Sequence, residues 1–268
     1  MTFPLPDQSA TCLVTGASSG IGREIARELA RRGYNLTLAA RRKQLIDQLA
    51  IELIAEFGVE VETNACDVSD AADRARLLES IAGTGKRIDI LVNNAAVGAD
   101  GKFFDGPLDR QLAQINTNVL AVVALTHPIV RLMVDQGSGA ILNVASTAAF
   151  QPMPRQNIYG ASKVFVLHFG EALHTELKGT GVTCTTLCPG PTRTEFMSAN
   201  GMGDYESSTP SWVWMTAQDT AVAGVNAMVH GDRTCVPKFV NKIGAVAGQK
   251  APRSLVLATF DRFWPVGR

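Results

Sequence analysis

The chain has 268 residues, of which 46% are hydrophobic and 19% charged, and its 25 basic side chains are balanced by 25 acidic ones. This composition excludes a disordered or fibrous chain and predicts a water-soluble globular protein with a large interior, and the length is compatible with one domain. A formal net charge of zero supplies no basic field to gather nucleic acid, so nucleic acid is not an expected partner. The N-terminus has no positive segment before an apolar run, and the five cysteines are scattered, so we expect a cytoplasmic protein without disulfides.

Strand and helix patterns alternate along the chain. Apolar runs predict strands at 10–15, 35–40, 59–66, 88–93, 140–146, 182–188 and 233–237. Helical spacing predicts helices over 20–32, 45–57 and 157–178. The alternation predicts a doubly wound, Rossmann-like parallel sheet with helices on both faces, and ligands bind such sheets beyond the carboxyl ends of the strands. We expect a catalytic domain over 1–240 and a C-terminal tail over 241–268.

A glycine-rich turn follows the first strand and opens the first helix. Its spacing is G-x-x-x-G-x-G, and such a turn lets the backbone approach a pyrophosphate at a helix N-terminus. The predicted binding residues of the turn are Gly16, Ser18, Ser19, Gly20, Ile21 and Gly22. A turn without a ligand is the alternative interpretation, but its place between strand and helix favours dinucleotide binding.

The end of the second strand indicates which dinucleotide is bound. Ala40 stands where an acid would bind the ribose of NAD, and Arg41 and Arg42 follow it. Without a carboxylate to repel a 2′-phosphate, and with Arg41 able to bind it through two N–H groups, NADP(H) is the expected cofactor. Alternatively, the two arginines form only a solvated helix start.

The chain resembles the short-chain dehydrogenase/reductase family of the single-domain type. The resemblance rests on 15–22, Asn93-Asn94-Ala95-Ala96, Ser146, the stretch from Tyr159 to Lys163, and Pro189-Gly190, in the family's order and spacing. It spans about residues 10–240, and departs from the family at Ala96, usually Gly, and at Thr192, usually aliphatic. The resemblance implies an oxidoreductase acting on alcohol and carbonyl groups, and a homodimer or homotetramer.

The proposed catalytic group has Tyr159 and Lys163 at its centre. They are four residues apart in a predicted helix, so their side chains share one face. A free tyrosine has a pKa of about 10, and a neighbouring ammonium lowers it, so Tyr159 can act as general acid or base on a ketone or alcohol. Ser146, at the end of its strand, can polarise the same oxygen.

Further site residues follow from the resemblance. It implies that Asn118 holds a water that connects Lys163 to solvent, although Asn116 is a second candidate for that position. It also implies that Asp67 and Val68 hold the adenine, with a helix N-cap as the alternative for Asp67. The remaining implied cofactor contacts lie over the ribose or the nicotinamide carboxamide: Asn94, Ala95, Pro189, Gly190, Thr192 and Thr194, the last of which could equally cap a helix.

Other expectations concern the substrate, metals and the tail. Apolar side chains favour a fatty or polycyclic ketone, although the same residues could be core: Phe150, Met153, Met197, Trp212, Trp214 and Met215. No sequence motif has metal-ligand spacing, so a metal-independent reaction is expected. The tail could pack on another subunit, cover the cleft, or lie on a membrane surface, in that order of preference. The alternative to an enzyme is a non-catalytic regulatory or redox-sensing protein that keeps the cofactor site.

Overall fold

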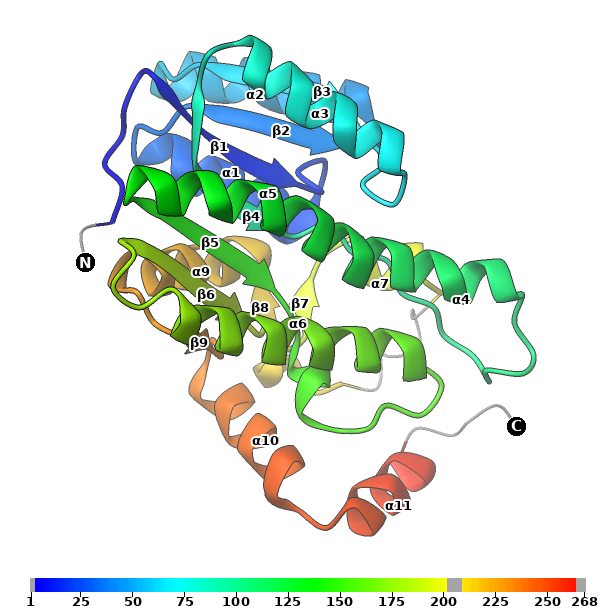
Figure 1. The fold of residues 1–268 in the computed structure, drawn as a ribbon. Coiled ribbons are helices and arrows are strands. Elements are labelled where there is room, and N and C mark those ends of the chain that lie inside the picture. Colours follow the sequence, from blue (N-terminus) through cyan, green and yellow to red (C-terminus); the bar gives the residue numbers. More distant parts are fainter. Residues whose placement is uncertain (1–2, 202–208, 264–268) are drawn as a thin grey trace.

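Seven parallel strands form the central sheet in the order β3-β2-β1-β4-β5-β6-β9 (Figure 1). Their bounds are β1 (Ala10–Thr15), β2 (Leu36–Ala40), β3 (Val61–Ala65), β4 (Arg87–Asn93), β5 (Gly139–Val144), β6 (Val182–Leu187) and β9 (Thr234–Cys235). The computed structural model describes residues 3–201 and 209–263. The predicted Rossmann-like sheet is confirmed, and each predicted strand is present within three residues of its expected ends.

Helices cover both faces of the sheet (Figure 1). One face carries α1 (Gly20–Arg31), α2 (Lys43–Phe57) and α9 (Ala217–His230), and the other carries α3 (Ala71–Gly83), α5 (Ala121–Gln136) and α6 (Asn157–Glu176). The helix α4 (Leu108–Ile115) runs into α5 through a π-helical turn at Asn116–Leu120. The predicted alternation of strand and helix therefore builds three layers.

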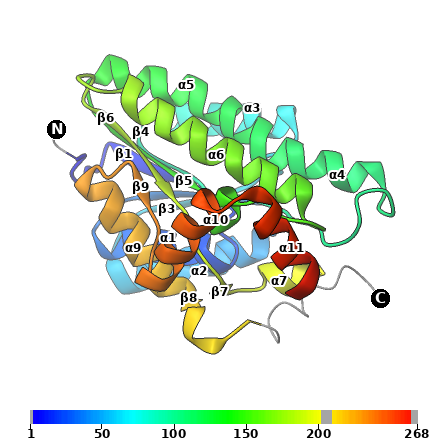
Figure 2. The ribbon, with the colours of Figure 1, turned by 90° about the horizontal axis from the view of Figure 1, so that it is seen from below.

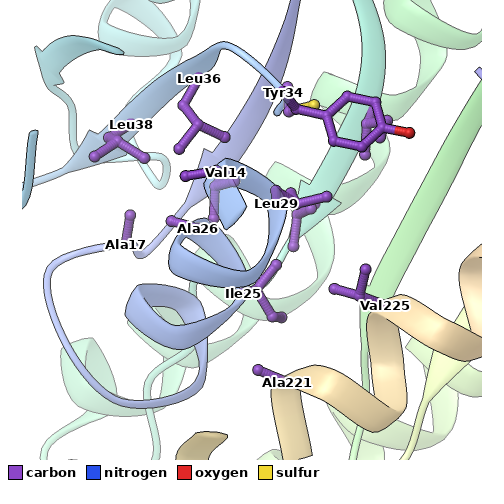
Figure 3. Close-up of a cluster of buried hydrophobic side chains, with 14 of the residues drawn as sticks. Val14, Ala17, Ile25, Ala26, Leu29, Tyr34, Leu36, Leu38, Ala221 and Val225 are labelled. Atoms are coloured by element: carbon purple, nitrogen blue, oxygen red, sulfur yellow. The ribbon is translucent and has the colours of Figure 1, made fainter. Parts of the chain in front are cut away.

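The core under α1 shows why the pattern of its sequence folds in this way. Ile25 and Leu29 are fully buried between the sheet residue Val14 and the α9 residues Ala221 and Val225 (Figure 3). Their spacing of four places both side chains on one face of the helix. Truncating Leu29 to alanine here costs about 2–5 kcal/mol, because the packed surroundings cannot close over the gap.

The order of the strands creates a crevice beside β1. From β1 the chain moves outward to β2 and β3, and then returns to place β4 on the other side of β1. The connections after β1 and β4 therefore diverge at the carboxyl ends of the strands, where open α/β sheets bind ligands. The sequence motifs that follow these strands meet at this edge.

One helical run within the described parts of the chain is long and apolar enough to cross a membrane, judged by length and composition alone. It is Leu108–Gln136, with a hydropathy of 1.6 and 39% of its apolar window buried. Its residues Leu125, Ile129 and Met133 belong to the core beside the sheet. Packing in a helical layer therefore accounts for part of its apolar character.

Short elements and the C-terminal helices complete the fold. They are a 3-10 helix η2 (Thr147–Phe150), β7 (Thr192–Arg193), α7 (Phe196–Ala199), a 3-10 helix η3 (Ser211–Val213), β8 (Met215–Thr216), α10 (Phe239–Lys250) and α11 (Arg253–Phe263). β7 and β8 pair in a separate parallel ladder. The predicted tail contains most of α10 and all of α11, while its last residues, 264–268, lie outside the described residues.

Candidate active site

A cavity of about 640 Å³ lies at the carboxyl ends of the strands. This volume is in the usual range for a small-molecule or cofactor site. Of the catalytic and cofactor-binding residues predicted from the sequence, all line the cavity except Gly22 and Asn118. The structure thus brings together the segments that follow β1, β2, β3, β4, β5 and β6, from the turn at Gly16 to the segment at Thr194.

The Asn94 side chain holds the glycine-rich turn in place through hydrogen bonds. The backbone is left-handed at Gly16 (φ +68°) and Gly20 (φ +56°), a conformation that favours glycine. Asn94 Nδ2 donates to the carbonyls of Thr15 (2.9 Å) and Gly16 (3.2 Å). A Cβ at Gly22 would lie 2.2 Å from that same Nδ2, so Gly22 leaves space for the Asn94 side chain and does not line the cavity. Asn94, expected over the ribose, has an amide occupied by the turn.

Two arginines stand at the adenosine end of the cavity. Arg41 has 68% of its side chain exposed and lies 4.0 Å from Asp67 Oδ2. Arg42 Nη2 donates to Ser19 Oγ (2.7 Å), and its Nη1 donates to Glu195 Oε2 (3.1 Å). Arg42 is therefore tied both to the glycine-rich turn and to the segment that follows β7, whereas Arg41 is the less constrained of the two cations.

The loop after β3 forms the adenine-side wall. Asp67 Oδ1 accepts hydrogen bonds from the amide of Ser69 (2.9 Å) and from its hydroxyl (2.7 Å). The Val68 carbonyl accepts a hydrogen bond from Arg74 Nη1 (2.6 Å), and the Val68 side chain is buried. The N-cap of α3 is Asp70, not Asp67, which removes the alternative role for Asp67.

Tyr159 and Lys163 lie one turn apart on α6 and line the cavity together with Ser146. Lys163 Nζ lies 5.7 Å from the centroid of the Tyr159 ring and donates to the Val144 carbonyl (2.8 Å). The lysine is 3% exposed, and desolvation lowers its pKa to about 8. Ser146 Oγ accepts a hydrogen bond from the Ala148 amide (3.1 Å) at the start of η2, which fixes the side chain at the cavity wall.

Asn118 sits in the π-helical turn, a local geometry often found at functional sites. It is 1% exposed, whereas Asn116 is exposed. Its Oδ1 accepts from the Val97 amide (2.9 Å), and its Nδ2 donates to the Val97 carbonyl (2.9 Å) and to Ser162 Oγ (3.0 Å). This side chain positions Val97, which lines the cavity, against α6, and the burial favours Asn118 over Asn116 as the structurally fixed asparagine.

The segment after β6 is held between α10 and the glycine-rich turn. The Thr192 hydroxyl donates to the Gly190 carbonyl (3.0 Å). A Cβ at Gly190 would lie 2.4 Å from Asn241 Nδ2 of α10, and a Cβ at Gly20 would lie 3.1 Å from the Thr194 methyl. The predicted carboxamide-side segment is therefore packed closely against α10 at Gly190 and against the glycine-rich turn at Thr194.

Several residues of the cavity wall were not predicted from the sequence. They are Arg110, Gln156, Glu195 and Asn200, while Arg42 was named in the sequence but not assigned a contact. Asn200 Oδ1 accepts from the Gly98 amide (2.8 Å), and its Nδ2 donates to the Phe196 carbonyl (2.6 Å). The contact between Asn200 and Gly98 joins residues 102 positions apart in the chain, so no local sequence signal could have revealed it.

The apolar residues expected in a substrate pocket divide into two groups. Met153 and Met197 line the cavity, together with Phe196, whose ring lies 5.5 Å from that of Tyr159. Four others do not line it: Phe150, Trp212, Trp214 and Met215. Trp214 is 6% exposed and serves as core, as the alternative interpretation held.

Strand order and cleft define a Rossmann-like α/β protein, and comparisons with known proteins give its family. The family model for the short chain dehydrogenases matches residues 10–203. The chain is 36% identical over 218 residues to sulfoacetaldehyde reductase 2 of Chromohalobacter salexigens, covering 78% of this chain and 84% of that protein. It is 34% identical over 263 residues to very-long-chain 3-oxoacyl-CoA reductase of Anas platyrhynchos, covering 95% and 81%.

A solved structure agrees with these relatives. The short-chain dehydrogenase from Sphingobium yanoikuyae in complex with NADPH is 32% identical and superposes with a TM-score of 0.80, covering 93% of this chain and 95% of that one. The chain belongs to the short-chain dehydrogenase family. It is an oxidoreductase, as the sequence predicted.

Proposed function

We propose that this protein is an NADP(H)-dependent oxidoreductase that interconverts a ketone and a secondary alcohol, with Tyr159 as general acid and base. The observation that carries the proposal is the placement of Tyr159, Lys163 and Ser146 on one cavity wall, with a buried ammonium beside the phenol ring. Only a protein that moves a proton at this position needs that arrangement, so it favours an enzyme over a non-catalytic cofactor-binding protein.

The cavity suits NADP(H). The N-terminus of α1 at Gly20 offers free amides and a positive dipole end to a pyrophosphate. Arg41 and Arg42 offer two cations to a 2′-phosphate, and the solved relative from Sphingobium yanoikuyae holds NADPH. When bound, the cofactor supplies or accepts a hydride at the substrate carbon.

The protein's own groups handle the proton. During reduction, Tyr159 donates its phenolic proton to the substrate carbonyl oxygen, and during oxidation its phenolate takes one from the alcohol. Lys163 carries a positive charge at neutral pH, because its pKa of about 8 lies above 7, and this charge favours the phenolate. The Ser146 hydroxyl hydrogen-bonds the same substrate oxygen as negative charge develops on it.

Tyr159→Phe tests the proposal directly. Removing the phenol proton should lower kcat for ketone reduction by about 10²–10⁴-fold, while NADPH binding, measured by fluorescence, stays within a factor of about two. Tyr34→Phe is the matched control, because Tyr34 donates its hydroxyl to the Pro4 carbonyl, does not line the cavity, and should keep its turnover. Failure of the wild type to turn over any ketone of a broad panel with NADPH, despite binding it, would instead support the non-catalytic alternative.

An apolar ketone is the substrate we propose. Met153, Met197 and Phe196 supply flexible apolar wall beside Tyr159, and thioether side chains adapt to irregular shapes. The relative from Anas platyrhynchos is named for a very-long-chain 3-oxoacyl substrate. A panel of ketones followed by NADPH absorbance should give the highest kcat/KM for bulky or long-chain members, and activity confined to small charged substrates would contradict this assignment.

Self-association and location remain predictions. The outer side of α4 and α5 exposes apolar residues that a second copy could cover: Leu108, Leu112, Ile115, Val123 and Leu132. A dimer or tetramer in sedimentation is expected, and Leu112→Asp with Val123→Asp should dissociate it. A monomer of the wild type at working concentration would reject self-association. A cytoplasmic location is expected and can be checked by cell fractionation.

A further inference from the structure

The helix α10 turns small and partly polar residues toward the protein and large apolar residues outward, the reverse of the usual arrangement. Asn241, Ala245 and Gly248, at spacings of four and three, are buried against the body of the protein. Asn241 packs on Gly190 and Gly248 on Gln151, so the inward face supports the wall of the active-site cavity. This inward face is small and partly polar.

The outward face of α10 is apolar. Phe239 is 78% exposed, Ile243 53% and Val246 52%, and they recur at the same helical spacing on the opposite side of the helix. A helix whose outer face contacts only water normally carries polar residues on that face. On α11, Leu255 (60%) and Leu257 (42%) are also exposed. Figure 2 looks onto this end of the molecule, with α10 and α11 in front of the sheet.

The charge of this region is one-sided. Between Asp232 and Asp261 the sequence has no acidic residue but five basic ones, namely Arg233, Lys238, Lys242, Lys250 and Arg253, of which Arg233 is paired with Glu171 of α6 (3.4 Å). Lys242 and Lys250 are exposed and fall on the outward side of α10, beside Ile243 and Val246. The same surface therefore joins large apolar side chains to unbalanced positive charge.

We propose that the C-terminal face, defined as Phe239, Ile243, Val246, Leu255 and Leu257 with Lys242 and Lys250, docks on an anionic phospholipid surface. Apolar side chains flanked by lysines are the pattern of helices that lie in the membrane interface. The apolar groups enter the headgroup boundary, and the lysines attract the negative lipids.

A second copy of this chain fits the C-terminal face less well. A two-fold contact through this surface would bring two positively charged faces together, and residues 233–260 contain no acidic side chain that could pair with Lys242 or Lys250 of the other copy. Like charges across an interface oppose association. The exposed apolar side of α4 and α5 offers self-association a surface on a different part of the molecule.

Docking would bring the active site close to the lipid. The inward face of α10 contacts Gly190 and Gln151, two residues of the cavity wall, and Arg253 Nη1 of α11 donates to the Phe150 carbonyl (3.4 Å) in η2. An apolar ketone dissolved in the membrane could then reach the cavity without crossing bulk water. The docking itself does not depend on the proposed reaction.

Co-sedimentation of the full-length protein with vesicles tests the docking. The protein should pellet with phosphatidylglycerol-containing vesicles, pellet poorly with pure phosphatidylcholine vesicles, and be released by high salt. Phe239→Asp with Ile243→Asp should weaken the apparent affinity by about tenfold or more. Lys242→Gln and Lys250→Gln should each weaken it about fivefold. Ile51→Asp, on α2 and 70% exposed, is the matched control and should pellet like the wild type.

Three results would overturn the proposal. The first is a wild-type protein that stays in the supernatant with anionic vesicles at low salt, and the second is one that pellets equally with neutral vesicles. The third is a change of sedimentation coefficient without lipid when Phe239 and Ile243 are replaced, which would show that another subunit covers the face. Unchanged NADPH binding by the variants excludes loss of fold as the cause.

Discussion

Lys163→Met should make the free enzyme more stable at neutral pH while removing its activity. Burial lowers the pKa of Lys163 from 10.5 to about 8, so at pH 7 the folded protein holds a charge that the unfolded chain solvates better. One pKa unit corresponds to about 1.4 kcal/mol, so the lowered pKa of Lys163 destabilises the folded state by about 3 kcal/mol at pH 7. In the variant the Val144 carbonyl loses its 2.8 Å hydrogen bond, and this loss destabilises the variant by about 1 kcal/mol. The net gain is about 2 kcal/mol.

The gain must also depend on pH. Between pH 8 and 10.5 the unfolded chain binds more protons at Lys163 than the folded protein does, so the wild type gains stability as the pH rises through this window. The advantage of the variant should therefore shrink to about zero near pH 10. Thermal unfolding measured at both pH values should show the variant about 4–8 °C higher at pH 7 and equal at pH 10.

Lys178→Met is the control for this experiment, because Lys178 is an exposed lysine just beyond the end of α6. It should show no comparable difference from the wild type at either pH. If Lys163→Met is less stable than the wild type at pH 7, or if its gain does not change with pH, then the buried ammonium does not cost what its desolvation indicates, and the reasoning is refuted.

Other substitutions test the cavity from different sides. Glu195→Gln removes the carboxylate that binds Arg42 at 3.1 Å, so NADPH should bind about two- to fivefold tighter while NADH affinity is unchanged, as fluorescence titration would show. Gly22→Ala forces a Cβ to within 2.2 Å of Asn94 Nδ2 and should lower the free energy of unfolding by about 1–3 kcal/mol, which urea denaturation can check. Ser146→Ala should lower kcat by about 10²-fold with little change in NADPH affinity, as steady-state kinetics would reveal.

The hydrophobic pattern of the sequence predicts which strands and helices form, but not all of their boundaries. The strands at β1 and β5 read as apolar runs because both faces are covered, and every residue of each is buried. The strand β9 has two residues instead of the expected five, because only Thr234 and Cys235 pair with β6 at the edge of the sheet. The helix α10 begins at Phe239, inside the range expected for the catalytic domain, since its boundary depends on packing against η2 and Gly190 and not on a local signal.

For the site, the sequence predicted which residues gather but not which bonds they make. Residues at the carboxyl ends of parallel strands meet by topology, which is why Gly16, Asp67 and Ser146 could be placed in one cleft before any distance was known. Whether Arg41 or Arg42 contacts the glycine-rich turn depends on side-chain direction at the start of α2, and here Arg42 does so. Glu195 could not be recognised, because its partner lies 153 residues away.

Three energetically unfavourable features surround the same cavity. Lys163 is a charge buried at 3% exposure, Arg155 has a backbone φ of +68° next to the cavity-lining Gln156, and Asn118 lies in a π-helical turn. Each of these lowers stability unless its surroundings hold it in place, and such features gather at functional sites. Here the constraints come from fixed hydrogen bonds: Arg155 Nε donates to Asp100 Oδ1 (3.1 Å), and Asn118 accepts from the Val97 amide and donates to the Val97 carbonyl. Three unfavourable local features thus lie around the cavity that holds Tyr159, and the stability gained by removing Lys163 would measure one part of what that arrangement costs.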